Sequence, residues 1–316
     1  MLQAFFGSPC IFGDIAWRIL LRLSPMDYAM GLLVPLIWGM GFVFAKAALE
    51  HFPPIFLMSL RFMVTALVLV WFVPIPRRHL KMIFGITFIS AAVQYSLTFT
   101  GLKGLDASIA ALVVQLEVPF LVLLGVIFLG ETAGKIKWFG ILLAFLGVGL
   151  IAGTPKLEGA WISLLMVVGG AFTWAVGQAL FRKLEEVKGL TMAAWMAVCA
   201  VPQLLVMSFI FEDNHMAALQ GAGWTVWGAV IYLGILMTAV GYGAWYSLVR
   251  RHPISKVGPF LLLLPVFSII GAAVFLGESL TFYTVIGGII VISGVGLIMV
   301  EERLAARKEK KAAQAI

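Results

Sequence analysis

The sequence is poor in charge. Only 12% of its 316 residues are Asp, Glu, Lys or Arg, whereas 62% are hydrophobic, and the mean hydropathy is +1.06. A water-soluble domain needs polar groups over its surface, and no stretch of this chain is polar enough to form one. The composition therefore excludes a soluble protein and predicts an integral membrane protein.

Residues that carry chemistry are also scarce. The two cysteines, Cys10 and Cys199, lie far apart and provide neither a disulfide framework nor metal-ligand spacing. The histidines all fall in predicted loops, and the aspartates lie outside the predicted membrane spans or at their edges: His51, His79, His215, His252; Asp14, Asp27, Asp106, Asp213. No nucleophile–base pair is visible within the membrane. We expect no metal and no cofactor, and an intramembrane enzyme is only a distant alternative.

Ten apolar runs are long enough to cross the hydrocarbon core of a bilayer, which takes about 20 residues as a helix. They lie near 27–49, 54–73, 80–102, 106–129, 135–153, 159–181, 190–211, 224–249, 255–276 and 280–300. The short connections between them force consecutive helices to run antiparallel. The predicted fold class is an all-α integral membrane protein with ten transmembrane helices.

Charge placement predicts the orientation. With both termini in the cytoplasm, the inner loops carry most of the basic residues, whereas the outer loops hold only Lys103 and Lys156. This asymmetry predicts that both termini face the cytoplasm. The net charge of +7 therefore indicates contact with anionic lipid headgroups of the bilayer, and we expect no nucleic acid partner.

The two ends of the chain fit the pattern less well. Residues 1–25 are partly apolar but lack the basic start and the cleavage site of a signal peptide. They are interpreted as an N-terminal extension, either an interfacial helix or sequence upstream of a true start at Met26. Residues 301–316 form a basic tail.

An internal repeat divides the chain. Gly147-Val148-Gly149-Leu150-Ile151 recurs as Gly294-Val295-Gly296-Leu297-Ile298, and Phe128-Leu129-Gly130-Glu131 recurs as Phe275-Leu276-Gly277-Glu278. The predicted repeats are residues 26–155 and 156–300, with five helices each. Because five is odd, the second repeat enters the membrane from the opposite side. Two inverted repeats around a central cavity are the architecture of many transporters that work by alternating access.

Short motifs carry a family resemblance. Trp38-Gly39-x-x-Phe42-x-x-x-Lys46, Leu60-Arg61-Phe62 and the two Phe-Leu-Gly-Glu segments resemble the EamA family of the drug/metabolite transporter superfamily, over residues 27–300. The resemblance is strongest to bacterial exporters of amino acids and related metabolites. It implies a ten-helix bundle with a central cavity in the cytoplasmic membrane, which moves small polar solutes outward.

Glu117 is the first candidate for the transport chemistry, because it falls near the middle of the fourth span. An acidic group at the bilayer centre costs on the order of 3 kcal/mol, so it should face the bundle interior or water. Burial favours its protonated form, which would suit proton coupling or the binding of a substrate amine. Glu117 lies outside the family motif, and a neutral, hydrogen-bonded structural role is the alternative.

Other candidates are polar or aromatic groups within the spans. Amides could bind a zwitterionic solute or join two helices, and aromatic rings could form cavity walls or simply pack: Gln94, Gln115, Gln178; Trp38, Tyr95, Trp174, Tyr242, Tyr246. Ser90, Gln94 and Thr98 form one polar stripe that should face the interior. Two intramembrane cations remain: Lys46 is expected to reach the interface, and Arg61 to pair with Glu50 or with a substrate carboxylate.

Pro119 and Pro265 occupy corresponding positions in the two repeats. Each removes one backbone donor, so the carbonyls of Gln115 and Leu261 should lose their helical partners. We expect a kink beside the cavity at each proline, with or without hinge motion.

The sequence leaves several properties open. Alternative cargoes are nucleotide sugars, phosphorylated metabolites and drug-like cations. Export or import, proton coupling or facilitated diffusion, and a monomer or a homodimer are not distinguished. The glycines at 140, 147, 149, 287, 294 and 296 allow close helix contact, either between the two halves or between two copies of the chain.

Overall fold

The computed structural model describes residues 23–154, 157–181, 184, 187, 189–252 and 254–313. Within these residues, ten helical stretches are long and apolar enough to cross a membrane: Pro25–Leu49, Pro54–Phe72, Leu80–Lys103, Ala107–Phe128, Lys135–Ala152, Trp161–Phe181, Gly189–Phe211, Trp224–Arg251, Gly258–Leu276 and Phe282–Glu301. Every span predicted from the sequence is confirmed to within three residues at either end.

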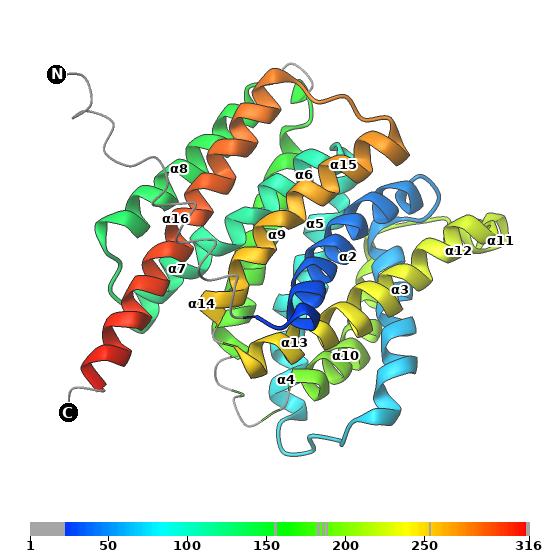
Figure 1. Ribbon diagram of the computed structural model, residues 1–316. Coiled ribbons are helices and arrows are strands. Elements are labelled where there is room, and N and C mark those ends of the chain that lie inside the picture. The colour runs from blue at the N-terminus through cyan, green and yellow to red at the C-terminus, as the bar shows by residue number, and fades with distance from the viewer. Residues whose placement is uncertain are drawn as a thin grey trace.

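The helices pack as one bundle (Figure 1). The uninterrupted spans are α2 (Pro25–Leu49), α8 (Lys135–Ala152), α9 (Trp161–Phe181), α10 (Gly189–Phe211) and α16 (Phe282–Ala313). The second span is α3 (Pro54–Leu69) followed by a 3-10 turn, η1 (Val70–Phe72). A short helix that the sequence did not suggest, α11 (His215–Gly221), precedes the eighth span.

Four further spans change helix type along their length. The third is α4 (Leu80–Thr87), a π-helical segment η2 (Phe88–Val93) and α5 (Gln94–Lys103); the eighth is α12 (Trp224–Ile231), the π-helical η6 (Tyr232–Val240) and α13 (Gly241–Arg251). The fourth is α6 (Ala107–Val113), the 3-10 segment η3 (Val114–Leu116) and α7 (Glu117–Leu129). The ninth is α14 (Ile254–Val257), the 3-10 segment η7 (Gly258–Leu263) and α15 (Leu264–Leu276).

These boundaries recur between the two halves. The helices α7 and α15 are both 13 residues long, and their starts are 147 residues apart. Each ends at a glycine with φ of 66°, Gly130 or Gly277, a left-handed conformation that glycine adopts without strain. The starts of α8 and α16, and the ends of η2 and η6, are also 147 residues apart. The same local structure is therefore built twice, as the repeated motifs suggest.

Glycines bring α8 and α16 into direct backbone contact, and the two helices lie side by side in Figure 1. A Cβ on Gly140 would lie 2.6 Å from the Gly294 carbonyl oxygen, and one on Gly147 would lie 2.7 Å from that of Gly287. In the repeat, Gly140 corresponds to Gly287 and Gly147 to Gly294. Each glycine therefore contacts the counterpart of the other one, and we call such contacts crossed. The two equivalent helices therefore contact each other in antiparallel order. The glycines thus join the two halves.

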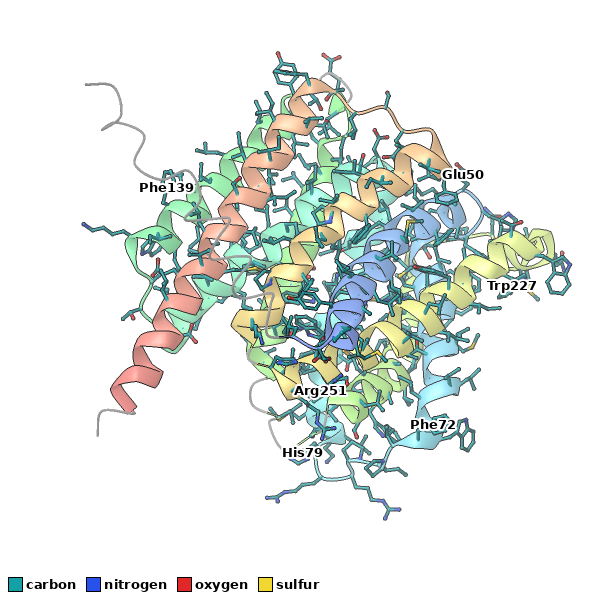
Figure 2. The ribbon with its side chains drawn as sticks, viewed as in Figure 1. Glu50, Phe72, His79, Phe139, Trp227 and Arg251 are labelled. Atoms are coloured by element: carbon teal, nitrogen blue, oxygen red, sulfur yellow. The ribbon has the colours of Figure 1, made fainter. Side chains whose placement is uncertain are left out.

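The connecting segments gather at two ends of the bundle. At one end, Glu301 of α16 accepts hydrogen bonds from the backbone N–H groups of Gly134 and Lys137, and Asp27 contacts Arg251 and His252. We call this the basic end. At the other end, Lys46 donates to the carbonyls of Leu102 and Lys103. Figure 2 shows Glu50 at this second end and Phe72 and His79 at the first. Consecutive spans therefore alternate in direction.

Carboxylates from the second half cap helices of the first half. Glu278 accepts hydrogen bonds from the backbone N–H groups of Ala107 and Ser108 and from the Ser108 hydroxyl, at 2.6, 3.1 and 2.6 Å. Glu212 does the same for Ile55 and Phe56, at 2.7 and 2.9 Å. The first N–H groups of a helix have no partner within it, and a carboxylate also complements the helix dipole. These caps tie the two halves together at their ends.

The outward surface carries large apolar side chains, and aromatic residues stand at the ends of several spans. Trp71, Phe72 and Trp224 are 80%, 75% and 93% exposed. Aromatic belts of this kind occur where transmembrane helices leave the hydrocarbon core. The chain is a multi-pass membrane protein.

The glycine contact between α8 and α16 predicts that a larger residue at this contact lowers the stability of the protein. Gly147→Ala places a methyl group 2.7 Å from the Gly287 carbonyl oxygen and from Val291 Cγ2. Such overpacking costs roughly 1–3 kcal/mol, so the melting temperature of the detergent-purified protein should fall by several degrees. Gly149→Ala is the matched control, because nothing lies within 4 Å of its Cβ position. Equal melting temperatures for the two variants would contradict the contact.

The cap formed by Glu278 predicts a loss of stability. Glu278→Ala leaves the buried backbone donors of Ala107 and Ser108 without their acceptor, which should cost about 2 kcal/mol. Thermal unfolding in detergent measures this loss. Glu50→Ala at the same end is the control, since Glu50 is exposed and the described residues offer it no hydrogen-bond donor. A Glu278→Ala protein as stable as the control would show that the cap contributes nothing.

Candidate functional site

Glu117 is the first residue of α7, where the 3-10 turn η3 passes into the α-helix. The residue is half-buried, and among the described residues its side chain has no hydrogen-bond or ion-pair partner. The structural alternative, a carboxyl held by hydrogen bonds, therefore lacks its partner in the described part of the chain. Its neighbour Gln115 is also partly exposed, and its buried Nε2 atom has no acceptor.

The two prolines lie where they disturb the hydrogen bonding least. Pro119 and Pro265 fall in the first turn of α7 and α15, each directly after a 3-10 segment. The Leu261 carbonyl accepts a hydrogen bond from Leu264, and the Gln115 carbonyl accepts one from Glu117. Each carbonyl thus lacks the N–H donor that the proline removes, and a nearer backbone N–H group donates to it instead. Each proline marks a change of helix type.

Trp38 is the centre of an aromatic cluster near the middle of α2. Its ring centroid lies 5.1 Å from that of Tyr242 and 6.2 Å from that of Trp245, with interplanar angles of 52° and 56°. The indole N–H donates to the Met237 carbonyl at 3.0 Å. All three rings are partly exposed. The sequence analysis did not single out Trp245, because its span holds several aromatic residues. Only the fold shows that this one contacts Trp38. The side chain of Tyr246 lies outside the described set.

The polar stripe on the third span packs against α9. Ser90, Gln94 and Thr98 are 4%, 4% and 2% exposed. A Cβ on Gly170 or Gly177 of α9 would collide with Thr98 or Ser90, so two glycines of α9 allow this close approach. Gln94 Nε2 donates to Thr98 Oγ1 at 3.2 Å, whereas Gln94 Oε1 has no partner. The stripe lies in the interior as expected, but it faces a neighbouring helix.

The remaining candidates on α9 are Trp174 and Gln178. Both are partly exposed, and neither has a ring contact or hydrogen bond among the described residues. The helix α9 packs against α5 and α7, just as α2 packs against α13 and α15. The first helix of each half thus lies against the third and fourth spans of the other half. Trp38 and Trp174 occupy these two equivalent helices.

The two intramembrane cations have different surroundings. Lys46 Nζ donates to the carbonyls of Leu102 and Lys103 at 3.1 and 2.9 Å, so its charge complements the C-terminal end of α5. Arg61 is 1% exposed and donates to Thr238 Oγ1 at 3.3 Å. Glu50 is exposed and is not the partner of Arg61, which corrects one of the two pairings expected from the sequence.

Among the described residues, no group of three or more His, Cys, Asp or Glu side chains could hold a metal ion. A cavity of about 550 Å³ lies at the end opposite the basic end, and residues such as Glu50, Lys103 and Asp213 line it. The candidates within the spans are not part of its lining.

Comparisons with known proteins agree with this architecture. The model of the EamA-like transporter family matches residues 26–153 and again residues 161–300. Proteins described as a probable amino-acid metabolite efflux pump, from Salmonella typhimurium and from Escherichia coli, are each 30% identical over 283 residues, 86% of this chain and 94% of theirs. An uncharacterized transporter of Archaeoglobus fulgidus is 28% identical over 83% of this chain and 94% of its own.

A solved crystal structure shows the same fold, with a TM-score of 0.62 at 18% identity over 88% of this chain and 97% of the solved one. The double family match covers nearly all the described spans, and the relatives are named as transporters and not as enzymes. The chain belongs to the EamA-like transporter family.

Proposed function

We propose that this transporter exports amino acids or related small polar metabolites across the cytoplasmic (inner) membrane. The observation that carries the proposal is the match to two probable amino-acid metabolite efflux pumps, which extends over 94% of their length. No large segment of those relatives is missing from the match.

The duplicated construction supports alternating access. Equivalent helices α8 and α16 contact each other in crossed order, and the first helix of each half packs against the other half. Two halves related in this way can exchange conformations, so that a site between them opens first to one face and then to the other. The spatial inversion of the complete halves is part of the proposal.

The basic end is proposed to face the cytoplasm, together with both termini. Arg77, Arg78, Lys135 and Lys137 lie in the loops at this end or next to them, whereas the opposite end has Glu50, Asp106, Glu212, Asp213 and Glu278. Basic loops stay in the cytoplasm during membrane insertion.

The interior chemistry favours a small zwitterion over a phosphorylated solute. A phosphate dianion needs several free cations, and of the two candidate intramembrane cations Lys46 is occupied by the carbonyls of α5. The Glu117 carboxyl has no protein partner in the described structure, and the cluster of Trp38, Tyr242 and Trp245 offers ring faces. A carboxylate and aromatic faces are both suited to an ammonium group. Glu117 is proposed to bind the solute's amine or a coupling proton.

The proposal predicts the behaviour of Glu117→Gln in an efflux assay. Cells that overproduce the protein are preloaded with a labelled amino-acid mixture, and loss of label is followed with time. Producing cells should release particular amino acids faster than cells with an empty vector. Glu117→Gln keeps the shape but removes the charge and the titration, so efflux should fall about tenfold or more, as the loss of one favourable ionic contact implies.

Glu50→Gln is the matched control, because it removes an exposed carboxylate at the end of a span. Membrane abundance of each variant is measured in the same cells. Unchanged efflux in Glu117→Gln would assign Glu117 a structural role. No difference between producing and empty cells for any amino acid would contradict the cargo and favour another solute class.

A further inference from the structure

Arg61 carries a positive charge that the described protein groups do not neutralise. The side chain is 1% exposed. Its Nη2 atom donates to Thr238 Oγ1 at 3.3 Å, its Nη1 atom lies 4.0 Å from Met58 Sδ, and its Nε atom has no partner. A guanidinium has five N–H donors, and here one protein oxygen accepts from it.

Neither deprotonation nor an ion pair with a described residue removes this charge. Arginine stays protonated in proteins, so it cannot become neutral as a buried lysine can. The ion pairs of the described chain involve Asp27 with Arg251 and His252, and no carboxylate of the described residues lies within 4.0 Å of Arg61. A buried charge without a counter-ion is strongly unfavourable. The site therefore needs an anion that the described residues do not supply.

The surroundings indicate the kind of anion. Arg61 Cζ lies 4.8 Å from the ring centroid of Tyr95 and 5.4 Å from that of Phe62. The planar fork of a guanidinium matches the two oxygens of a carboxylate, and its flat faces stack on aromatic rings. One guanidinium between aromatic rings suits a planar monoanion, whereas a phosphate dianion would need further cations.

Tyr95 is the more exposed of the two aromatic neighbours of the guanidinium. It is partly exposed and contacts the rings of Phe62 and Phe99 as well as Arg61. Its hydroxyl forms no hydrogen bond with the described residues, so no such bond has to break before the side chain turns. The partner of Arg61 across the interface, Thr238, belongs to the π-helical η6, and π-helical turns are frequent at functional sites.

We propose that Arg61 is the subsite for the carboxylate of the transported solute, with Tyr95 and Phe62 as its walls. This inference rests on the proposed export function and narrows its cargo to solutes that carry a carboxylate. An amino acid then binds through both of its charged groups, the carboxylate at Arg61 and the amine elsewhere in the interior.

A stability assay tests the subsite without transport. The detergent-purified full-length protein is melted in sodium propionate, in sodium chloride of the same ionic strength, and in sodium chloride with propionamide. Propionate should raise the melting temperature by about 2 °C or more over both references, because it binds only the folded site. Arg61→Gln should abolish this rise. Lys46→Gln is the matched control and should keep it, since Lys46 is held by the carbonyls of α5.

A second variant covers the case in which Arg61→Gln does not fold. Thr238→Val preserves the side-chain shape and removes the one protein oxygen that accepts from Arg61. Its melting temperature without propionate should be lower, and the rise caused by propionate should exceed that of the unaltered protein. If Arg61 has only a structural role, propionate should not change the melting temperature of any variant. No rise, an equal rise in Arg61→Gln, or an equal rise in chloride overturns the proposal.

Transport then separates the two proposals. An amino acid that the protein exports should leave the cell about tenfold faster than its carboxamide, because the amide offers Arg61 no charge. Arg61→Gln should lose this preference. Stabilisation by propionate without efflux of any amino acid would support the carboxylate subsite and contradict the amino-acid cargo. Equal export of acid and amide by the unaltered protein would overturn the subsite.

Discussion

The close approach of α8 and α16 determines how the two halves meet. Because Gly140, Gly147, Gly287 and Gly294 lack side chains, the two backbones contact each other directly. In a bilayer, apolar side chains gain little by leaving lipid for protein, so contacts between small residues supply much of the association between helices. The pairing of Gly140 with Gly294 and of Gly147 with Gly287 makes these two helices antiparallel.

Polar groups at the ends of the helices complete the assembly. Glu212 and Glu278 lie in the second half, Glu301 follows directly after it on α16, and each caps a helix that begins in the first half. Lys46 caps the opposite kind of helix end, because it donates to a carbonyl at the C-terminal end of α5. Few polar groups occur in this chain, and at the helix ends they satisfy backbone donors and acceptors that the membrane would leave without partners. A charged residue in a family motif can therefore be structural.

Two charged groups that lack such partners have a proposed role in transport. Glu117 has no partner among the described residues, and Arg61 has one long hydrogen bond to an oxygen, a contact with the sulfur of Met58 and two aromatic neighbours. Both charges lie within spans, where an unpaired ionisable group is unfavourable and is retained mainly for function. A zwitterion presents the complementary pair of charges. The proposed cargo and the proposed carboxylate subsite thus follow from the same feature, which is incomplete pairing in the interior.

The sequence by itself determined the ten spans and their alternating direction, because about 20 apolar residues are needed to cross the hydrocarbon core wherever the chain does so. It also determined the repeat, since the Gly-Glu and Gly-Val-Gly motifs recur in one register. The tertiary structure decided which polar groups find partners. Only the fold places Lys46 on the end of α5, Thr238 beside Arg61, and Trp245 beside Trp38. Those contacts join residues 56 to 207 positions apart, and the pattern of apolar residues along one helix contains no information about its partner in another.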